Sequence, residues 1–264
     1  MTRAIGLAAL TVLECPHDAQ VRIAAQAGYS HVGLRLVPVA GQPYSHPLDL
    51  PLLERVLADT GVRVLDVEVF RLTPQTQVAD WESALAAAQR LGASDILVHG
   101  ADAEEKRLVE TFGRLCELAG RHGLRANLEP MPWVEVSNID KALRVLRGAG
   151  RSNGGLLVDA IHFFRARDSL AELQKVPREY LHYAQLCDAR PEIPTDLQEI
   201  IRQARGDRLF PGEGGLDLRG LLSALPAALP LSLEIPVSEN MPPLERARRA
   251  RTATEAILRA SEAT

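Results

Sequence analysis

Short apolar runs alternate along the chain with amphipathic segments of helix length. Several runs are continuously apolar, as expected for strands of a parallel sheet that is buried on both faces. A glycine repeatedly closes a helical segment before the next run begins, and glycine is the residue that most readily ends a helix. The pattern predicts eight strands, at residues 5–11, 31–36, 63–69, 95–99, 124–128, 155–158, 181–186 and 231–235.

Each predicted strand is followed by a predicted helix. The helices are expected at residues 18–27, 50–60, 80–91, 103–121, 138–147, 169–174, 218–225 and 243–260, with a short extra helix at 197–204 and a loop at 37–47. Eight such units favour an α/β fold whose strands close into a (β/α)8 TIM barrel. A doubly wound open sheet usually has a glycine-rich turn after its first strand, and residues 10–16 contain no glycine. No linker rich in serine or glycine divides the chain, so we predict one domain spanning residues 1–264.

The composition limits the class of partner and the compartment. A net charge of −4, with 46% hydrophobic and 24% charged residues, is ordinary for a globular protein and argues against nucleic acid or an anionic membrane as a partner. No apolar run approaches the ~20 residues that span a bilayer. We interpret the apolar run 4–13 as the first strand and not as a signal sequence. Three cysteines without paired spacing predict reduced thiols and a cytoplasmic location.

Four of the predicted strands end in a side chain that can bind a metal ion. These side chains are Glu129, Asp159, Gln185 and Glu234, and each follows a short apolar run. In a parallel barrel the carboxyl ends of the strands meet at one mouth, where barrels place their chemistry. A buried carboxylate must be paired or must coordinate something. The four strand ends therefore predict a metal site at that mouth.

The types of ligand indicate the metal and its role. Two glutamates, one aspartate and one glutamine offer only oxygen atoms, which suits Mg²⁺ or Mn²⁺ better than zinc. Three carboxylates in one site repel one another strongly unless a cation is bound. One divalent ion would relieve the repulsion and act as a Lewis acid on vicinal oxygen atoms of a substrate. Such a site stabilises the enediolate or enolate of an aldose–ketose isomerisation, an epimerisation or a β-elimination.

Proton transfer needs a further group. His162 follows Asp159 by three residues, so a turn after the strand end can aim both side chains at one centre. Histidine needs only a small pKa shift to transfer protons near neutral pH. Glu129 and Glu234, on opposite sides of the ion, are alternative bases. We predict substrate contacts from five residues at the same mouth, namely Glu68, Arg71, His99, Trp133 and Arg208.

The segment Arg208-Leu-Phe-Pro-Gly-Glu213-Gly precedes the last strand, where barrels often hold a phosphate. Its glycines allow a ligand to approach the backbone closely, but Glu213 would repel a phosphate group. We therefore favour a substrate without phosphate, with Arg208 holding a carboxylate or a hydroxyl group.

Together these residues resemble the xylose-isomerase-like barrel superfamily, which includes sugar isomerases, tagatose-type 3-epimerases, hydroxypyruvate isomerase, inosose dehydratase and 3-dehydroshikimate dehydratase. The resemblance covers nearly the whole chain, and the stretch 129–234 is its most specific part. It implies that Glu129, Asp159, Gln185 and Glu234 hold one Mn²⁺ or Mg²⁺ ion, and it is compatible with a homodimer. Gln185 departs from the histidine of the sugar epimerases. It is similar to the dehydroshikimate dehydratase branch, where the histidine after the aspartate, here His162, is the catalytic acid–base.

The leading interpretation is a divalent-metal-dependent isomerase or epimerase that acts on a sugar or a polyol ketone through an enediolate. The alternative is a lyase that eliminates water from a cyclic hydroxy-ketone such as 3-dehydroshikimate. A third interpretation is a non-catalytic barrel that binds a sugar. In each case the expected partner is a small molecule.

Overall fold

The computed structural model describes residues 3–39 and 46–262. Within these residues, nine parallel strands form one sheet in the order β6-β5-β4-β3-β2-β1-β9-β8-β7. The strands are β1 (Ile5–Leu7), β2 (His31–Arg35), β3 (Arg63–Leu72), β4 (Asp95–Gly100), β5 (Arg125–Glu129), β6 (Gly154–Leu156), β7 (Val158–Asp159), β8 (Ala184–Leu186) and β9 (Leu231–Leu233).

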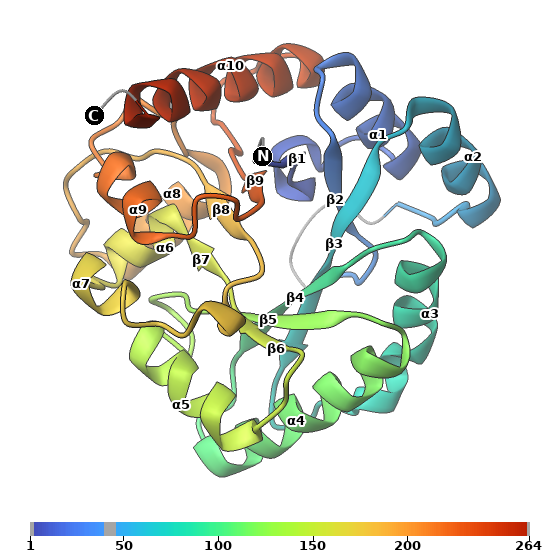
Figure 1. Cartoon of the computed structure of the whole chain (residues 1–264), viewed down its shortest axis with the longest axis vertical. Helices are drawn as coiled ribbons and strands as arrows, with labels where there is room; N and C mark the ends of the chain where they lie inside the picture. Colours follow the sequence, from blue (N-terminus) through green and yellow to red (C-terminus); the bar gives the residue numbers. More distant parts are fainter. Residues whose placement is uncertain (1–2, 40–45, 263–264) are drawn as a thin grey trace.

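The sheet curls into a nearly closed barrel (Figure 1). β6 and β7 stand at opposite ends of the sheet order, yet only Leu157 separates them in the chain. The backbone N–H of Leu157 donates a hydrogen bond to the carbonyl of Leu128, 3.0 Å away. This residue therefore stays bonded to β5, and β7 then pairs with β8. The predicted TIM barrel is confirmed, with its sixth strand divided into two.

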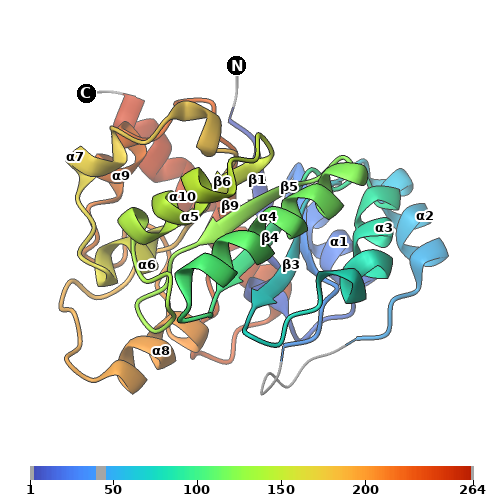
Figure 2. The same ribbon diagram turned by 90° about the horizontal axis from the view of Figure 1, so that it is seen from below.

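Ten α-helices of the described chain surround the barrel (Figures 1 and 2). They are α1 (His17–Gln26), α2 (Leu50–Thr60), α3 (Glu82–Arg90), α4 (Glu105–Arg121), α5 (Ile139–Ala149), α6 (Ala160–Arg165), α7 (Leu170–Leu173), α8 (Leu197–Gly206), α9 (Leu218–Ala224) and α10 (Pro243–Glu262). Three short 3-10 helices, η1 (Ala9–Val12), η2 (Val78–Trp81) and η3 (Arg178–Tyr180), lie between them. The last helix, α10, packs against α1 and η1, so it closes the ring beside the first strand.

The main hydrophobic core lies between the sheet and the helices, and α4 illustrates how it forms. The Glu104 carboxylate accepts hydrogen bonds from the backbone N–H groups of Lys106 (3.0 Å) and Arg107 (2.7 Å), which caps the start of the helix. Phe112 and Leu115 follow on one face, three residues apart, and both are fully buried. Burial of each such side chain contributes about 1.5–3 kcal/mol. This packing holds α4 against β5 and α5.

The inside of the barrel contains a second, smaller apolar cluster. It consists of Leu65, Val69, Leu97, Leu157 and Tyr183, all buried. Polar and charged side chains occupy the interior near the first and the last residues of the same strands. The interior therefore has two polar ends separated by a thin apolar middle.

Two predicted strands are shorter in the structure by three residues or more. The strand predicted at 5–11 ends at Leu7, and η1 follows it. The reason is Thr11, whose hydroxyl donates to the carbonyl of Leu233 (2.7 Å) and accepts from the N–H of Ile235 (2.8 Å), so the chain bonds to β9 through a side chain. The strand predicted at 181–186 begins only at Ala184, because η3 and the turn after it precede the ladder.

Other predictions missed an element or an end. β3 continues to Leu72, beyond the predicted 63–69, and α6 was not predicted at all. The sequence of α6 is almost entirely buried and so lacks the polar face that marks an amphipathic helix. The predicted loop at 37–47 includes residues 40–45, which lie outside the described residues. In the part of the chain that is described, no helix combines the length and the apolar character needed to cross a membrane.

Candidate metal centre and active site

The four predicted metal ligands lie at the carboxyl ends of their strands. Glu129 is the last residue of β5, Asp159 is the last of β7, Gln185 is in β8, and Glu234 directly follows β9. Asp159 and Gln185 are register partners in neighbouring strands. The exposed fractions of the four residues are 3%, 1%, 1% and 5% in chain order. Buried polar groups at one end of one barrel must be satisfied by one another or by a ligand.

Three side chains of this group converge on one point. One potential ligand atom from each of Glu129, Asp159 and His162 lies within 4.8 Å of the others. Asp159 caps α6, because its Oδ1 accepts a hydrogen bond from the backbone N–H of His162 at 3.2 Å. This first turn of α6 directs the imidazole back to the strand ends, and His162 Nε2 lies 3.8 Å from Glu129 Oε1. The turn that the spacing of Asp159 and His162 predicted is present.

Two of the predicted ligands, Asp159 and Glu234, are joined by Arg208. Its guanidinium group forms ion pairs with Asp159 Oδ2 (2.7 Å) and Glu234 Oε2 (2.6 Å), and all three side chains are buried. Arg208 Nε also donates to the carbonyl of Ala204 at 2.7 Å, which fixes the guanidinium plane. Gln185 Nε2 donates to Glu234 Oε1 at 3.1 Å. Both oxygen atoms of Glu234 are therefore engaged.

Three buried polar atoms in the centre have no hydrogen-bond partner among the described residues. They are Glu129 Oε1, Gln185 Oε1 and His162 Nδ1. Burial of such an atom without a partner costs about 1–3 kcal/mol. Two acceptor oxygens and an imidazole nitrogen are groups that bind a divalent cation. The residues present therefore fit a metal ion, with Glu129 and Gln185 as the ligands that most need one.

The electrostatics of the centre also favour a cation. Burial raises the pKa of Glu129 well above its ordinary value, and the charge of Asp159 adds to the effect. Burial raises the pKa of Glu234 in the same direction, although Arg208 opposes it. Burial would also raise the pKa of Asp159, but Arg208 and His162 outweigh it and hold this pKa below its ordinary value. Burial lowers the pKa of His162 to about 3, so the imidazole is neutral at neutral pH.

A cavity of about 150 Å³ opens above this centre. Its lining includes Glu129, His162 and Glu234, together with all five residues predicted to contact a substrate: Glu68, Arg71, His99, Trp133 and Arg208. The ring of Trp133 contacts the ring of His162 edge to face, with 4.9 Å between centroids. His99 Nε2 hydrogen-bonds to Glu129 Oε2 at 2.7 Å. The cavity thus gathers the predicted residues, while their roles stay predictions.

Two charged lining residues were not predicted. Arg35 ends β2 and pairs with Glu68 Oε1 at 2.7 Å, both side chains being buried. The rule that selected the other strand ends could have found Arg35 as well. Arg205 belongs to α8 and lines the same cavity. Nothing in the local sequence distinguishes it from other helical arginines.

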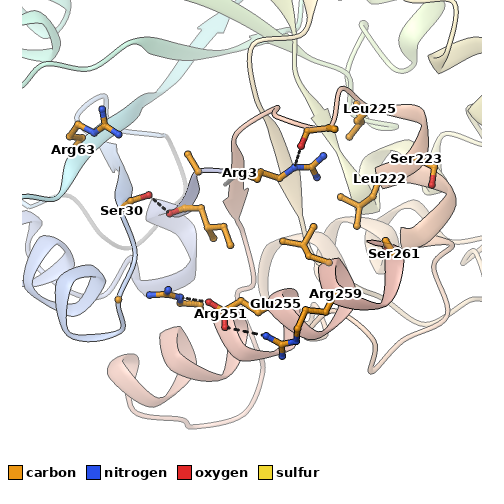
Figure 3. Close-up of a pocket in the computed structure, with 15 residues that line it drawn as sticks. Arg3, Ser30, Arg63, Leu222, Ser223, Leu225, Arg251, Glu255, Arg259 and Ser261 are labelled. Carbon is orange, nitrogen blue, oxygen red and sulfur yellow. Dashed lines mark hydrogen bonds and ion pairs between the residues drawn. The ribbon is translucent and has the colours of Figure 1, made fainter. Parts of the chain in front are cut away.

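A wider hollow lies on the opposite face of the barrel, near the amino ends of β1, β2 and β3 (Figure 3). Its volume is about 1180 Å³, and Arg3, Arg63, Arg251, Glu255 and Arg259 contribute to its lining. Arg251 pairs with Glu255 at 2.8 Å, and Arg3 donates to two backbone carbonyls. These contacts are structural ones, at the end of the barrel that serves stability and not chemistry.

Residues 21–259 match a protein family described as xylose isomerase-like TIM barrel. A 3-dehydroshikimate dehydratase of Pseudomonas aeruginosa is 30% identical over 201 residues, which cover 69% of this chain and 31% of that protein. An inosose isomerase of Bacillus velezensis is 27% identical over 123 residues, which cover 46% of this chain and 42% of that isomerase. The chain thus spans about a third of the dehydratase. The crystal structure of the IOLI protein, solved with a bound zinc atom, superposes with a TM-score of 0.80 at 17% identity, over 98% of this chain and 99% of that one.

Proposed function

The chain belongs to the xylose isomerase-like TIM barrel family, and we propose that it is a divalent-metal-dependent enzyme that isomerises a small hydroxy-ketone through an enediolate. One observation carries the proposal. The unpaired oxygens of Glu129 and Gln185 lie at the carboxyl end of the barrel, and so does His162, a buried histidine that is neutral. An ion site and a proton-transfer group next to each other are what an enediolate mechanism requires.

Each residue then has a distinct role. Glu129, Asp159, Gln185 and Glu234 would hold the ion, which we propose is Mn²⁺ or Mg²⁺ because the four donors are oxygens. When bound, the ion supplies Lewis-acid stabilisation of negative charge on neighbouring substrate oxygens. Arg208 keeps Asp159 and Glu234 in place through its two ion pairs.

Proton transfer is proposed on one face of the substrate. His162 Nε2 and the unpaired Glu129 Oε1 lie 3.8 Å apart, and both residues line the cavity. Both carboxylate oxygens of Glu234 already accept from Arg208 and Gln185, so neither is free to take a proton. A single base, supplied by His162 or Glu129, would move a proton between neighbouring carbons of the substrate. This arrangement favours isomerisation over an epimerisation that needs two bases. Trp133, edge to face with His162, would hold the imidazole and exclude water.

A second candidate is elimination of water from a cyclic hydroxy-ketone. The similar dehydratase covers more of this chain than the similar isomerase does, which favours it. The same base could remove the proton next to the carbonyl and then return it to the β-hydroxyl group, which leaves as water. The two reactions share the first step and differ in the substrate. We further propose a cytoplasmic location, on the basis of three free cysteines, and a homodimer.

The test begins with metal content and then compares substrates. The purified protein should contain roughly one divalent ion per chain, and Mn²⁺ or Mg²⁺ should restore activity after chelation. A ketose, an inosose and 3-dehydroshikimate are then supplied in turn, with chromatography for isomers and ultraviolet absorbance for an aromatic product. Isomer formation supports the first candidate, and an aromatic product supports the second. Absence of ion binding, or ligand binding that is unchanged in Glu129→Gln, would favour a non-catalytic barrel.

A further inference from the structure

Four arginines line the cavity at the barrel mouth, and they fall into two pairs. Arg35 and Arg208 are buried and are each ion-paired with carboxylates of the centre. Arg71 and Arg205 are exposed and have no ion pair or side-chain hydrogen bond with any described residue. The first pair is therefore used by the protein itself, whereas the second pair is open to a ligand.

The open pair approaches the cavity from two different elements. Arg71 lies near the end of β3, where it is the register partner of His99 in β4. Arg205 lies near the end of α8 and lines the same cavity. Arg71, Arg205 and His99 all contribute to the lining of this one cavity. Two guanidinium groups beside one small cavity form a natural clamp for a planar anion.

The charge balance of the mouth supports an anionic ligand. Four carboxylates (Glu68, Glu129, Asp159 and Glu234) stand against the four arginines, so the protein groups alone are balanced. A bound divalent ion leaves an excess of about two positive charges. A carboxylate and a developing enediolate would supply about two negative charges between them. A phosphorylated substrate would supply more negative charge than the mouth needs.

We propose that the substrate carries a carboxylate group, which Arg71 and Arg205 bind at the rim while the ketone end lies beside Glu129 and His162. This inference rests on the proposed function and specifies its class of substrate as a small hydroxy-keto acid. A cavity of about 150 Å³ is large enough for one six-membered ring. The acid group then extends from the cavity to the two exposed arginines.

Binding of acid and neutral probes of the same shape tests the proposal without turnover. The probes are shikimate with its methyl ester, D-gluconate with D-glucitol, and D-glucose 6-phosphate as the phosphate arm. Calorimetry and quenching of tryptophan fluorescence report binding to the Mn²⁺-loaded wild type and to Arg71→Ala, Arg205→Ala and the double variant. Arg55→Ala, an exposed arginine of α2 outside the cavity lining, is the matched control.

The wild type should bind each acid roughly ten- to a hundredfold more tightly than its neutral partner, the range expected for charge-assisted hydrogen bonds. The double variant should lose this preference, and Arg55→Ala should keep it. Equal binding of acids and neutral probes, no binding of either acid, or tighter binding of the phosphate would each overturn the proposal.

The same samples separate this inference from the proposed function. Metal content and the effect of Glu129→Gln are measured alongside binding. An acid preference that depends on Arg71 and Arg205 in a protein that binds no ion would support the carboxylate site and contradict the metal mechanism. An ion site in a protein with no acid preference would support the metal mechanism and contradict the carboxylate site.

Discussion

The two polar ends of the barrel interior differ in how completely their groups are paired. At the amino end, Asp95 accepts four hydrogen bonds: from Arg125 Nε (2.9 Å) and Nη2 (2.6 Å), from Asn127 Nδ2 (2.9 Å) and from Ser94 Oγ (2.7 Å). The Asn127 side-chain oxygen in turn bonds to His182 Nδ1 at 2.8 Å. Each group of this network has a partner supplied by the chain, so the network around Asp95 needs no ligand.

The carboxyl end contains similar residue types but leaves some of them unpaired. Glu129 Oε1, Gln185 Oε1 and His162 Nδ1 are buried without a partner among the residues that the structure describes. The guanidinium group of Arg208 balances part of the negative charge there. The comparison teaches that burial of polar groups alone does not mark a site. Incomplete pairing of buried groups does, because the missing partner must come from outside the chain.

The largest expected effect is on catalysis at the carboxyl end. Glu129→Gln removes a charge from the ion site and replaces one carboxylate oxygen with an amide group that cannot act as a base beside His162. Turnover should fall by roughly 10²–10⁴-fold, the usual contribution of a general acid–base group. Steady-state kinetics on the substrate found by the screen measure it. Glu110→Gln, an exposed glutamate of α4, should leave turnover unchanged; a similar loss in both variants would remove the distinction between site and surface.

The next effect concerns the amino end and is one of stability. Asp95→Ala leaves Arg125 and Asn127 without their shared acceptor, which should cost about 3 kcal/mol. For a domain of this size, Tm should fall by roughly 6–12 °C. Thermal unfolding followed by circular dichroism measures the fall, and calorimetry with Mn²⁺ on the folded variant should give wild-type affinity. A loss of ion affinity in Asp95→Ala would mean that the two ends are coupled.

Addition of the ion should stabilise the folded protein through the carboxyl end alone. At a free Mn²⁺ concentration a hundred times its Kd, the wild type should gain about 2.7 kcal/mol, because the ion binds the folded chain alone. This corresponds to a rise in Tm of roughly 5–10 °C. The metal-free protein is the reference, and Glu129→Gln with the same ion is the control, in which the rise should be much smaller. An equal rise in both proteins would place the ion elsewhere.

The sequence predicted the parts of the fold and site that follow from local pattern. Apolar runs and closing glycines gave the barrel, and a parallel barrel necessarily brings strand ends such as Glu129 and Asp159 together. The spacing from Asp159 to His162 predicted a turn, since three residues are what a helix cap spans. These inferences needed only neighbours in the chain and the rule that all strand ends meet.

The remainder depends on tertiary partners, which no local pattern encodes. Arg208 was predicted to contact a substrate, and the structure gives it two buried carboxylates. Arg205 was not predicted, because only the placement of α8 over the mouth brings its side chain to the cavity. The helix α6 was missed because burial on nearly all sides removes its amphipathic signal. Partner choice of this kind is decided by the packing of distant segments.

The smallest predicted effect lies at Asp66 of β3, which is level with Asp95 of the amino end. Its register partners are Gly33 and Asp95, and its carboxyl lies so close to Gly33 that a Cβ there would be 2.8 Å from Oδ1. Both carboxyl oxygens are buried without a hydrogen-bond partner among the described residues. Burial, reinforced by the charges of Glu68 and Asp95, raises its pKa well above its ordinary value. Asp66 therefore resembles the carboxyl end in its lack of partners, and a proton can supply what is missing.

The pH dependence of stability tests whether Asp66 carries this proton. The folded chain holds the proton more tightly than the unfolded chain, so stability from this group is complete below about pH 4 and declines as pH rises toward the raised pKa. Asp66→Asn does not titrate and should match the wild type at pH 4 but exceed its Tm by roughly 2–4 °C at pH 8, about 1 kcal/mol. Asp59→Asn, an exposed aspartate of α2, should show no such trend. If Asp66→Asn instead lowered Tm at pH 8, the ionised carboxylate would have to be stabilised by a bound cation or ligand, and the unpaired region would extend from the mouth to the level of Asp95.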